Sequence, residues 1–421
     1  MPQFSLTEAT NLFKINYDKK SENMYNSANV MLGRIKKSYK FTGKQMYVAN
    51  PLSFSGGVGS GVLPEAGVAN YEDANIFAKK VYARCDIERE AIKASADDKG
   101  AFIRATKEVI QKCVESYTRN ASRILFGGGD GILGKGNATG ANVTGNGSVG
   151  TPYLVEIPAA FWNEANFEER DLVNVVTGIT ATAHPFTGGT AEATKLQVVA
   201  VDPTTRVVSL VGTSARLAAL VGGAIPMAAS DGIAMQGSYL NDPQGLKSIL
   251  DLTSGSAYGI PVQRRWSSYF ENAANAGITV DRINKGMLEV ERRCGKAPTM
   301  LVTSFTQYRK IMNQIEDHKR YSLPARDAKL KGQISFSGLE YMTSRGPIGI
   351  FADRFCDEDR LYLLNDNFIE SHHRPDFGWF DDDGTVFLRK ADDDAYEARY
   401  GGYYENYIVP TFHGVIDGLA V

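Results

Sequence analysis

The adjacent histidines His372 and His373 lie in the part of the sequence that comes nearest to a metal-binding constellation. They are followed by Asp376 and by the acidic run at residues 381–383. Imidazole and carboxylate groups bind divalent cations, but this spacing matches no defined zinc site. Neighbouring residues point in different directions on any regular element, and Asp-Asp-Asp-Gly is typical of a solvated turn. We therefore expect no metal and no other cofactor, with a loosely held divalent ion as the alternative.

Two glycine-rich segments raise the question of phosphate binding. Residues 56–61 lack the Gly-Lys-Ser/Thr ending of a P-loop, and no helical pattern follows them. Residues 127–131 come after a predicted helix, whereas phosphate binds at a helix N-terminus. The first segment therefore predicts the tip of a hairpin, and the second predicts the end of a helix.

Catalytic motifs are absent from the sequence. It contains no Gly-x-Ser-x-Gly elbow, no His-Glu-x-x-His helix and only five histidines. The acids Glu88, Glu90, Asp97 and Asp98 lie near the start of a predicted helix, where the helix dipole favours them. We therefore expect that the protein is not an enzyme.

Length and composition describe a globular chain of two or three cores. The 421 residues are 43% hydrophobic and 22% charged, and no apolar run is long enough to span a bilayer. Because the net charge is −2, the chain lacks the broad basic face of a nucleic-acid-binding protein. Four unpaired cysteines predict reduced, buried thiols, and the polar residues 1–16 lack a secretion signal.

Residues 1–43 show no sustained periodicity, which predicts an extended arm. Within the arm, residues 31–35 indicate a short anchored segment. Strand patterns at residues 44–52 and 71–88 flank the glycine-rich residues 53–67 and predict a protruding hairpin. Since a two-stranded ribbon is marginally stable in water, we expect it to lean on another subunit.

A helical repeat of apolar residues covers residues 97–126 and predicts a spine helix about 40 Å long. Arg119 and Arg123 suit the negative end of its dipole. The next residues, 127–150, are rich in Gly, Asn, Thr and Ser and predict a linker. Short β-rich runs in residues 152–237 then predict a small all-β module, a barrel, inserted into the host fold.

From residue 252 onward, helix and strand patterns alternate. Helices are predicted at residues 280–294 and 305–315, and strands at 299–303, 339–343, 348–352 and 361–364. The closing residues 385–388 and 396–410 are aromatic and alternating, which predicts strands that pair with earlier parts of the chain.

Five short sequences carry a resemblance to a known family, through their order and not through any one of them. They are Leu-Gly-Arg-Ile-Lys at 32–36, Ile-Leu-Phe-Gly-Gly at 124–128, Asp-Pro-Gln-Gly-Leu at 242–246, Gly-Pro-Ile-Gly-Ile-Phe at 346–351 and His-Gly-Val-Ile-Asp-Gly-Leu at 413–419. With the predicted order of elements, they make nearly the whole chain resemble the HK97-fold major capsid proteins of tailed bacteriophages.

The resemblance implies an α+β, HK97-like capsid fold with an N-arm, an extended loop, a peripheral domain built on the spine helix, an axial domain and, here, the inserted small β-barrel domain. The expected boundaries are 1–43 for the arm, 44–88 for the extended loop, 89–149 for the spine helix and first peripheral part, 150–237 for the insertion, 238–252 for the return, 253–378 for the axial domain and 379–421 for the closing peripheral strands.

The implied function is self-assembly, as hexamers and pentamers, into an icosahedral shell that encloses double-stranded DNA without sequence-specific binding. Some relatives cross-link a loop lysine to a neighbour's asparagine, but residues 45–78 contain no lysine, so we expect no cross-link here. Because only about forty residues precede the hairpin, we expect a separate scaffolding protein, with a portal and a decoration protein as further partners. The expected location is the virion, after assembly in the host cytoplasm and without membrane contact.

Candidate contacts between subunits are the basic residues of the arm, the glycines of the hairpin tip and the lysines that follow the hairpin. They are Arg34, Lys36, Lys37, Gly56, Gly57, Gly59, Gly61, Lys79 and Lys80. The basic arm residues are interleaved with aromatic ones, so packaged DNA is the alternative partner. Two alternative functions stay open: the shell of an encapsulin-like compartment, and a soluble α/β enzyme with an accessory β domain.

Overall fold

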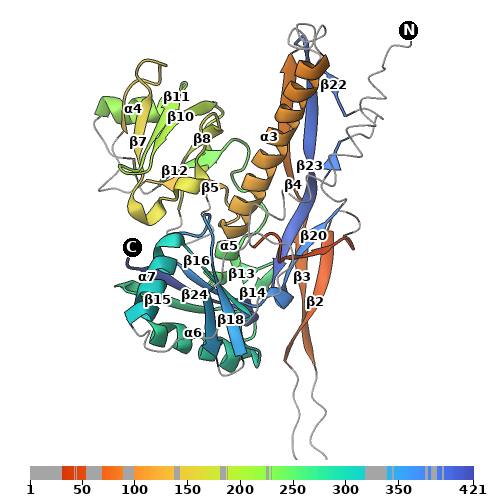
Figure 1. Cartoon of the computed structure of the whole chain (residues 1–421), viewed down its shortest axis with the longest axis vertical. Coiled ribbons are helices and arrows are strands. Elements are labelled where there is room, and N and C mark those ends of the chain that lie inside the picture. Colours follow the sequence, from red (N-terminus) through yellow and green to blue (C-terminus); the bar gives the residue numbers. More distant parts are fainter. Residues whose placement is uncertain are drawn as a thin grey trace, which may run out of the picture.

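The structure is a computed structural model that describes residues 31–41, 43, 45–53, 69–88, 99–136, 143–180, 186, 188–223, 227–228, 230–317, 339–343, 346–374, 378–380, 386–390 and 393–421. It is a mixed α+β fold (Figure 1). A long helix and a long strand run side by side, a β domain lies at the upper left, and an α/β domain lies below it.

Helix α3, Lys99–Phe126, is the predicted spine helix. Its buried residues Ile110, Cys113, Val114, Tyr117 and Ala121 recur at helical spacing on one face. The helix ends where the N–H of Gly127 donates to the carbonyl of Ile124. The spine prediction is therefore confirmed for residues 99–126, and residues 97 and 98 lie outside the described residues.

A central sheet is built around the long strand β23, Ala395–Ile408. One edge of β23 pairs antiparallel with β4, Lys79–Glu88, and the other edge pairs with β20, Ile369–His373. The arm strand β1, Lys36–Ser38, adds to β20 in parallel. Two short strands, β21 (Gly378–Trp379) and β22 (Leu388–Arg389), also pair with β23. The prediction that the aromatic closing residues pair with earlier parts of the chain is confirmed.

The hairpin consists of β2, Gln45–Ser53, and β3, Asn70–Phe77, paired antiparallel. The prediction of one strand over residues 71–88 is wrong, because the chain breaks at Ala78 and continues as β4 in the central sheet. The least exposed residues are even-numbered in β3 and odd-numbered in β4. The two segments thus face different surroundings, which a reading of the strand pattern as one run did not detect.

The β domain has an eight-stranded sheet and a core of its own. Its strand order is β5-β12-β8-β10-β11-β7-β6, with β9 on β8. The elements are β5 (Ile132–Lys135), β6 (Val143–Thr144), β7 (Tyr153–Glu156), β8 (Leu172–Thr177), β9 (Thr190–Ala191), β10 (Leu196–Asp202), β11 (Val207–Val211), α4 (Ala215–Gly223) and β12 (Asp231–Met235). Strands β5 and β6 stand at the two ends of this order, so closure into a barrel stays a prediction.

The linker prediction for residues 127–150 is wrong where β5 and β6 lie. Strand β5 pairs with β12, and β6 pairs with β7. Both strands are short, and glycines surround them, so composition alone indicated a loop. The sheet of the β domain therefore begins at Ile132, before the expected boundary at residue 150.

The α/β domain contains a six-stranded sheet ordered β15-β24-β19-β16-β18-β17. Its strands are β15 (Tyr269–Ala276), β16 (Met300–Thr303), β17 (Leu339–Thr343), β18 (Gly346–Ala352), β19 (Leu361–Leu364) and β24 (Gly414–Leu419). Helix α6, Val280–Cys294, starts at the capping side chain of Thr279 and ends at Gly295, which has a positive φ of 74°. Helix α7 is Phe305–Asp317.

Two strands in the last part of the chain, β20 and β24, lie in sheets other than the expected ones. Strand β24, expected among the peripheral strands, pairs with β15 and β19 of the α/β domain. Strand β20, expected within the axial domain, pairs with β23. Pairing partners far apart in sequence are decided by tertiary packing, which local patterns do not contain.

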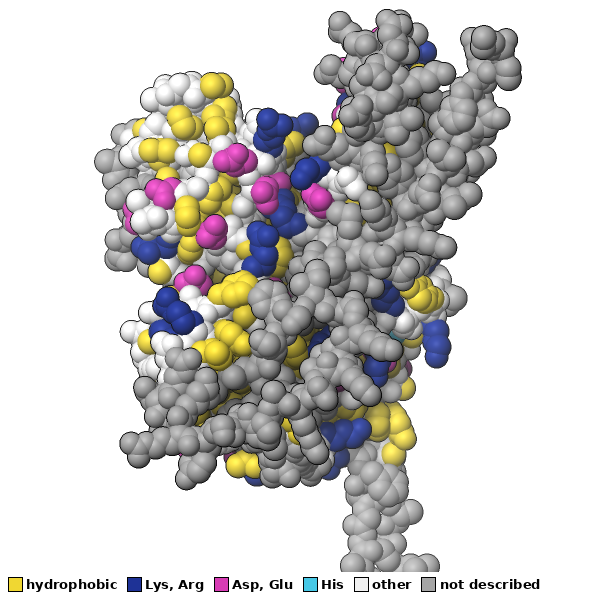
Figure 2. Space-filling model, in the orientation of Figure 1, with side chains coloured by type: hydrophobic (Ala, Val, Ile, Leu, Met, Phe, Trp, Pro, Cys, Tyr) yellow, Lys and Arg dark blue, Asp and Glu magenta, His cyan; other side chains and the backbone are white. Residues whose placement is uncertain are grey.

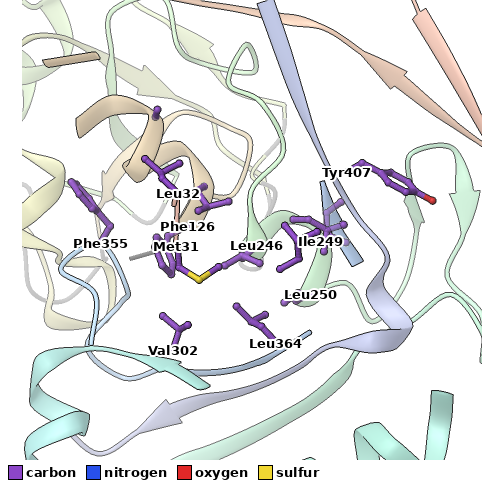
Figure 3. Packing of buried hydrophobic residues seen from close by; sticks show 14 of the residues in the cluster. Met31, Leu32, Phe126, Leu246, Ile249, Leu250, Val302, Phe355, Leu364 and Tyr407 are labelled. Atoms are coloured by element: carbon purple, nitrogen blue, oxygen red, sulfur yellow. The ribbon is translucent and has the colours of Figure 1, made fainter. Parts of the chain in front are cut away.

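The arm segment is anchored where the domains meet (Figure 3). Met31 and Leu32 are buried beside Phe126 of α3 and Leu246 of the short helix α5, Leu246–Leu250. Val302 and Leu364 of the α/β sheet belong to the same cluster. Two short strands, β13 (Ser256–Ala257) and β14 (Ile260–Pro261), follow α5. The predicted anchored segment at residues 31–35 is confirmed.

Candidate intersubunit surfaces

The basic arm residues bind their own subunit. The guanidinium of Arg34 lies 4.2 Å from the centre of the Phe351 ring. The Nζ of Lys36 donates a hydrogen bond of 2.8 Å to Oδ1 of Asn367. Lys37 lines a small cavity beside Tyr404. The end of the arm is therefore held in place by cation–π contact, hydrogen bonding and strand pairing.

The two lysines that follow the hairpin lie on β4. The Nζ of Lys79 donates to the carbonyl of Leu240 at 3.1 Å, and the Nζ of Lys80 lies 6.0 Å from the Tyr403 ring. Lys80 is exposed on the side of β4 that also exposes Tyr82. The candidates Gly56, Gly57, Gly59 and Gly61 lie outside the described residues.

The hairpin has one face on its own subunit and one face exposed. Met46, Val48 and Leu52 of β2 belong to the main core, together with Ala74 and Ile76 of β3. Because side chains alternate along a strand, the odd-numbered residues of both strands share the other face. The hairpin therefore leans on its own subunit, whereas the sequence led us to expect support from another subunit.

The exposed face of the hairpin is aromatic. Tyr47, Tyr71 and Phe77 expose 56%, 60% and 44% of their surface, and Pro51 stands opposite Tyr71 in the register. Side chains of this size are mostly buried in single subunits, so together they mark a contact surface. We call Tyr47, Pro51, Tyr71 and Phe77 the aromatic face. Their period-two spacing was visible in the sequence, but the exposed side could not be told from the buried one.

A groove of about 610 Å³ lies beside the aromatic face, against the second half of β2. Pro51 belongs to both surfaces. The opposite wall contains stacked rings of Phe368 and Phe412, with the Nζ of Lys296 lying 4.6 Å from the Phe368 ring centre. Arg265 also lines the groove. The second half of β2 thus borders a concave surface with aromatic and cationic groups, next to the aromatic face.

Arginines of α3 bind the β domain and the chain that leaves it. Two bonds of 2.6 and 2.8 Å join Nη2 of Arg119 to the carboxylate of Asp171, and Glu168 lies 3.3 Å from Nη1. Arg123 pairs with Asp242 at 3.0 Å. Figure 2 shows basic and acidic side chains interspersed where the β domain meets α3. The sequence assigned both arginines to the helix dipole, but their principal partners are these carboxylates.

A second ion-pair network joins α5 to the α/β domain. Arg360 lies 2.8 Å from both Asp251 and Asp417, and Lys247 lies 2.5 Å from Asp357. Every charge in this network has an opposite partner, which is typical of a structural role. The network connects segments far apart in sequence, so no local pattern revealed it.

Two buried acids and one half-buried acid have raised pKa values. Burial raises the pKa of Glu405 to about 8, although the N–H groups of Gln244 and Asn406 donate to its carboxylate. Burial likewise raises the pKa of Asp353 and of Asp359 to about 6. Acids with shifted pKa values mark catalytic sites when they converge in a cleft. None of these three acids lines the small cavity beside Tyr404 or the groove beside the aromatic face.

The adjacent histidines of β20 face different sides, as the sequence predicted. The Nε2 of His372 lies 3.5 Å from Glu370, and burial lowers the pKa of His372. The His373 ring packs on Tyr404 at 5.4 Å. Among the described residues, no group of three or more His, Cys, Asp or Glu side chains is placed to hold a metal ion. Asp376 and residues 381–383 lie outside the described residues.

In the part of the chain that the structure describes, no helix is both long and apolar enough to cross a membrane. No family model matches this chain, and no curated protein matches it.

Solved structures similar to this chain are capsid and encapsulin shells. The capsid asymmetric unit of cyanophage A-1(L) matches 94% of this chain and 94% of its own, at 12% identity and a TM-score of 0.50. The capsid of a native GTA particle covers 94% and 91%, at 8% identity and a TM-score of 0.45. The holo-SrpI encapsulin complex from Synechococcus elongatus PCC 7942 covers 93% and 87%, at 6% identity and a TM-score of 0.43.

We base the fold of this chain on the cyanophage subunit, because the TM-scores of the other two structures are below 0.5. At 12% identity the likeness concerns the fold. It extends over nearly the whole length of both chains, since 94% of each is covered. The chain therefore has the fold of a phage capsid protein, the HK97-like fold that the sequence resemblance implied.

Proposed function

We propose that this chain is a major capsid protein that assembles as hexamers and pentamers into an icosahedral shell around the double-stranded DNA of a tailed phage. The observation that carries the proposal is the aromatic face on the hairpin of a capsid-fold subunit. One side of the hairpin packs on the main core, so the aromatic face is held outward and available to a second copy. Closed shells are built from such repeated contacts between identical subunits.

The contact proposed for the aromatic face is noncovalent. Residues 45–78 contain no lysine, and Lys79 is bonded to a backbone carbonyl of its own subunit. Lys80, exposed next to Tyr82 on β4, is the lysine best placed to meet a neighbour. Arg34 and Lys36 have partners within the chain, so their part in assembly would be to fix the arm.

We assign residues 1–43 to the arm and residues 44–88 to the extended loop. Helix α3 and the central sheet form the peripheral domain, and the α/β sheet forms the axial domain. A separate scaffolding protein, a portal and a decoration protein are the proposed partners. Assembly in the host cytoplasm and residence in the virion follow from this role. The net charge of −2 supports enclosure of DNA over tight binding to it.

Electron microscopy of the protein, expressed alone and with the neighbouring genes of its operon, tests the proposal. We expect closed shells, or rings of five and six subunits, from the wild-type protein. Tyr71→Ser should reduce shell yield at least tenfold while leaving the subunit folded, because Tyr71 is 60% exposed. Val149→Ser is the matched control, since Val149 is 86% exposed but lies in the β domain.

The outcomes separate the alternatives. Shells that contain DNA support the phage capsid, whereas shells that contain a protein cargo would replace it with an encapsulin-like compartment. A protein that stays monomeric in both settings contradicts the shell itself. Equal yields from wild-type and Tyr71→Ser protein would exclude the aromatic face as the contact surface.

A further inference from the structure

The groove beside β2 carries positive charge. Arg265 and Arg293 line it. At the wall opposite β2, the Nζ of Lys296 lies 4.6 Å from the centre of the Phe368 ring. Glu370 is the one acid among the described residues that line the groove. Cations therefore outnumber acids here, so the groove favours a partner that combines a negative charge with aromatic groups.

Arg265 has a fixed backbone and an unpaired side chain. Its carbonyl accepts a hydrogen bond from the Thr411 hydroxyl. The side chain is exposed, and within the described part of the chain it has no ion pair, hydrogen bond or ring contact. Arg293 differs, because its Nη1 donates to the Ser268 carbonyl at 2.7 Å. Arg265 is therefore the guanidinium of the groove that is available to bind a carboxylate.

The aromatic face carries a carboxylate at its centre. Asp73 lies on β3 between Tyr71 and Phe77, and its side chain shares their side of the hairpin. It stands opposite Ala49 in the register, and both residues are exposed. None of the residues that the structure describes forms an ion pair or hydrogen bond with the Asp73 side chain. The face therefore presents one unpaired acid among exposed aromatic rings.

We propose that the groove of one subunit receives the aromatic face of a second copy, with Asp73 of one copy paired to Arg265 of the other. The rings of the face pack on the aromatic wall of the groove, beside Lys296. At about 610 Å³, the groove lies within the range of pockets that enclose drug-sized ligands, about 300–1,000 Å³. The contact rests on the proposed function, since it supplies the surface that the aromatic face meets in the shell.

A subunit does not fill its own groove with its own aromatic face. On the β2 side, the groove is lined by Pro51 and by the even-numbered residues Val48, Asn50 and Leu52. The aromatic face is odd-numbered, so apart from Pro51 it points away from this groove. A symmetric contact between two aromatic faces brings two Asp73 carboxylates together, which disfavours it. The contact therefore joins two different surfaces, and such a head-to-tail contact builds a ring when the rotation between copies closes.

Carbodiimide cross-linking of the wild-type protein tests the contact, because this reagent joins a carboxylate to an amine that it touches. Isotope-labelled and unlabelled protein are mixed, allowed to assemble, cross-linked and digested. We expect Asp73 linked to Lys296, with labelled peptides joined to unlabelled ones. Absence of this link would overturn the contact, and shells that form without it would leave the proposed function standing. The mixed-label link in protein that forms no shell would support the contact and contradict the shell. A link from Lys296 to a co-expressed protein, in place of Asp73, would assign the groove to that protein and overturn the contact.

Charge reversal gives a second measurement. Asp73→Arg and Arg265→Asp should each lower the shell yield by about tenfold or more, because like charges then meet in the groove. The double variant should recover to within about threefold of the wild type, since the pair is restored with its signs exchanged. Glu169→Arg is the matched control, because it reverses an exposed acid of the β domain and should assemble as the wild type does. Unchanged yields from both single variants, or a double variant no better than either one, would overturn the pairing. The wild-type cross-link stands whether or not the variants fold.

Discussion

Glu405 lies inside the subunit near Lys79 and Asp242, and burial raises its pKa to about 8 from an ordinary value of 4.5. The folded state therefore holds a proton that the unfolded state releases above about pH 4.5. Glu405 therefore makes its full contribution to the free energy of unfolding below about pH 4.5, and this contribution is lost as the pH rises through 8. Between pH 7 and pH 9 the free energy of unfolding should fall by on the order of 1 kcal/mol.

Other titrating groups act on both sides of this window. The pKa values of Cys294 and Cys356 are raised from 9.0 by burial, so these thiols weaken both the wild-type protein and the variant equally toward pH 9. Asp353 and Asp359, with pKa values of about 6, lose their contribution before pH 7. Burial lowers the pKa of His413 to about 4, so its contribution grows from pH 4 and is complete above about pH 6.5. Urea unfolding of wild-type and Glu405→Gln protein at pH 7 and pH 9 isolates the effect. Parallel losses in both proteins would show that Glu405 is not the source.

Between elements, the bidentate pair of Arg119 and Asp171 attaches the β domain to α3. Both side chains are mostly buried, with 13% and 16% exposed, so Asp171→Asn leaves a buried guanidinium without its main counter-charge. We expect a loss of about 2 kcal/mol in the free energy of unfolding. Glu168→Gln is the matched control, because Glu168 is 55% exposed beside the same arginine and should cost less than about 0.5 kcal/mol. Equal losses measured by urea unfolding would contradict this account.

The elements also show which parts of the fold the sequence could predict. Helix α6 was predicted with correct bounds because its signals are local: apolar residues recur at helical spacing, and Gly295 ends it in the left-handed region. The break at Ala78 and the place of β24 depend on partners distant in sequence, so they were missed. The same reason explains the candidate site. Arg34 was recognised as a basic arm residue, but its contact with Phe351 exists only in the folded chain.

At the scale of the whole molecule, the buried hydrophobic residues that the structure describes form three main clusters. One joins the arm, the hairpin, α3 and the central sheet; the second fills the β domain; the third fills the α/β domain. The chain enters the β domain through β5 and leaves it through β12. These two strands are neighbours, because they pair antiparallel. Just outside them, the N–H of Leu240 donates to the carbonyl of Asp130 at 3.0 Å. An insertion with neighbouring ends can be accepted by a host fold without disturbing the host core.

This geometry predicts that the segment 130–240 folds by itself. It contains every residue of the second cluster, including Val175, Leu196 and Leu210, none of which is exposed. Among the described residues, Ala165 is the one member of the segment in the main core cluster, and polar contacts with the host come from Arg119 and from the Asn163 side chain, which donates to the Phe355 carbonyl at 3.2 Å. Loss of such contacts exposes little apolar surface, so the core should survive excision.

The measurement is urea unfolding of the purified segment, followed by circular dichroism, with Val175→Asp as the control that places a charge in its core. We expect one cooperative transition in the wild-type segment and none in the control, because a buried, unpaired carboxylate costs more than a small domain can offset. A wild-type segment that unfolds without a transition would mean that α3 supplies part of the β-domain core. In that case the β domain would be an extension of the spine helix and not an independent insertion.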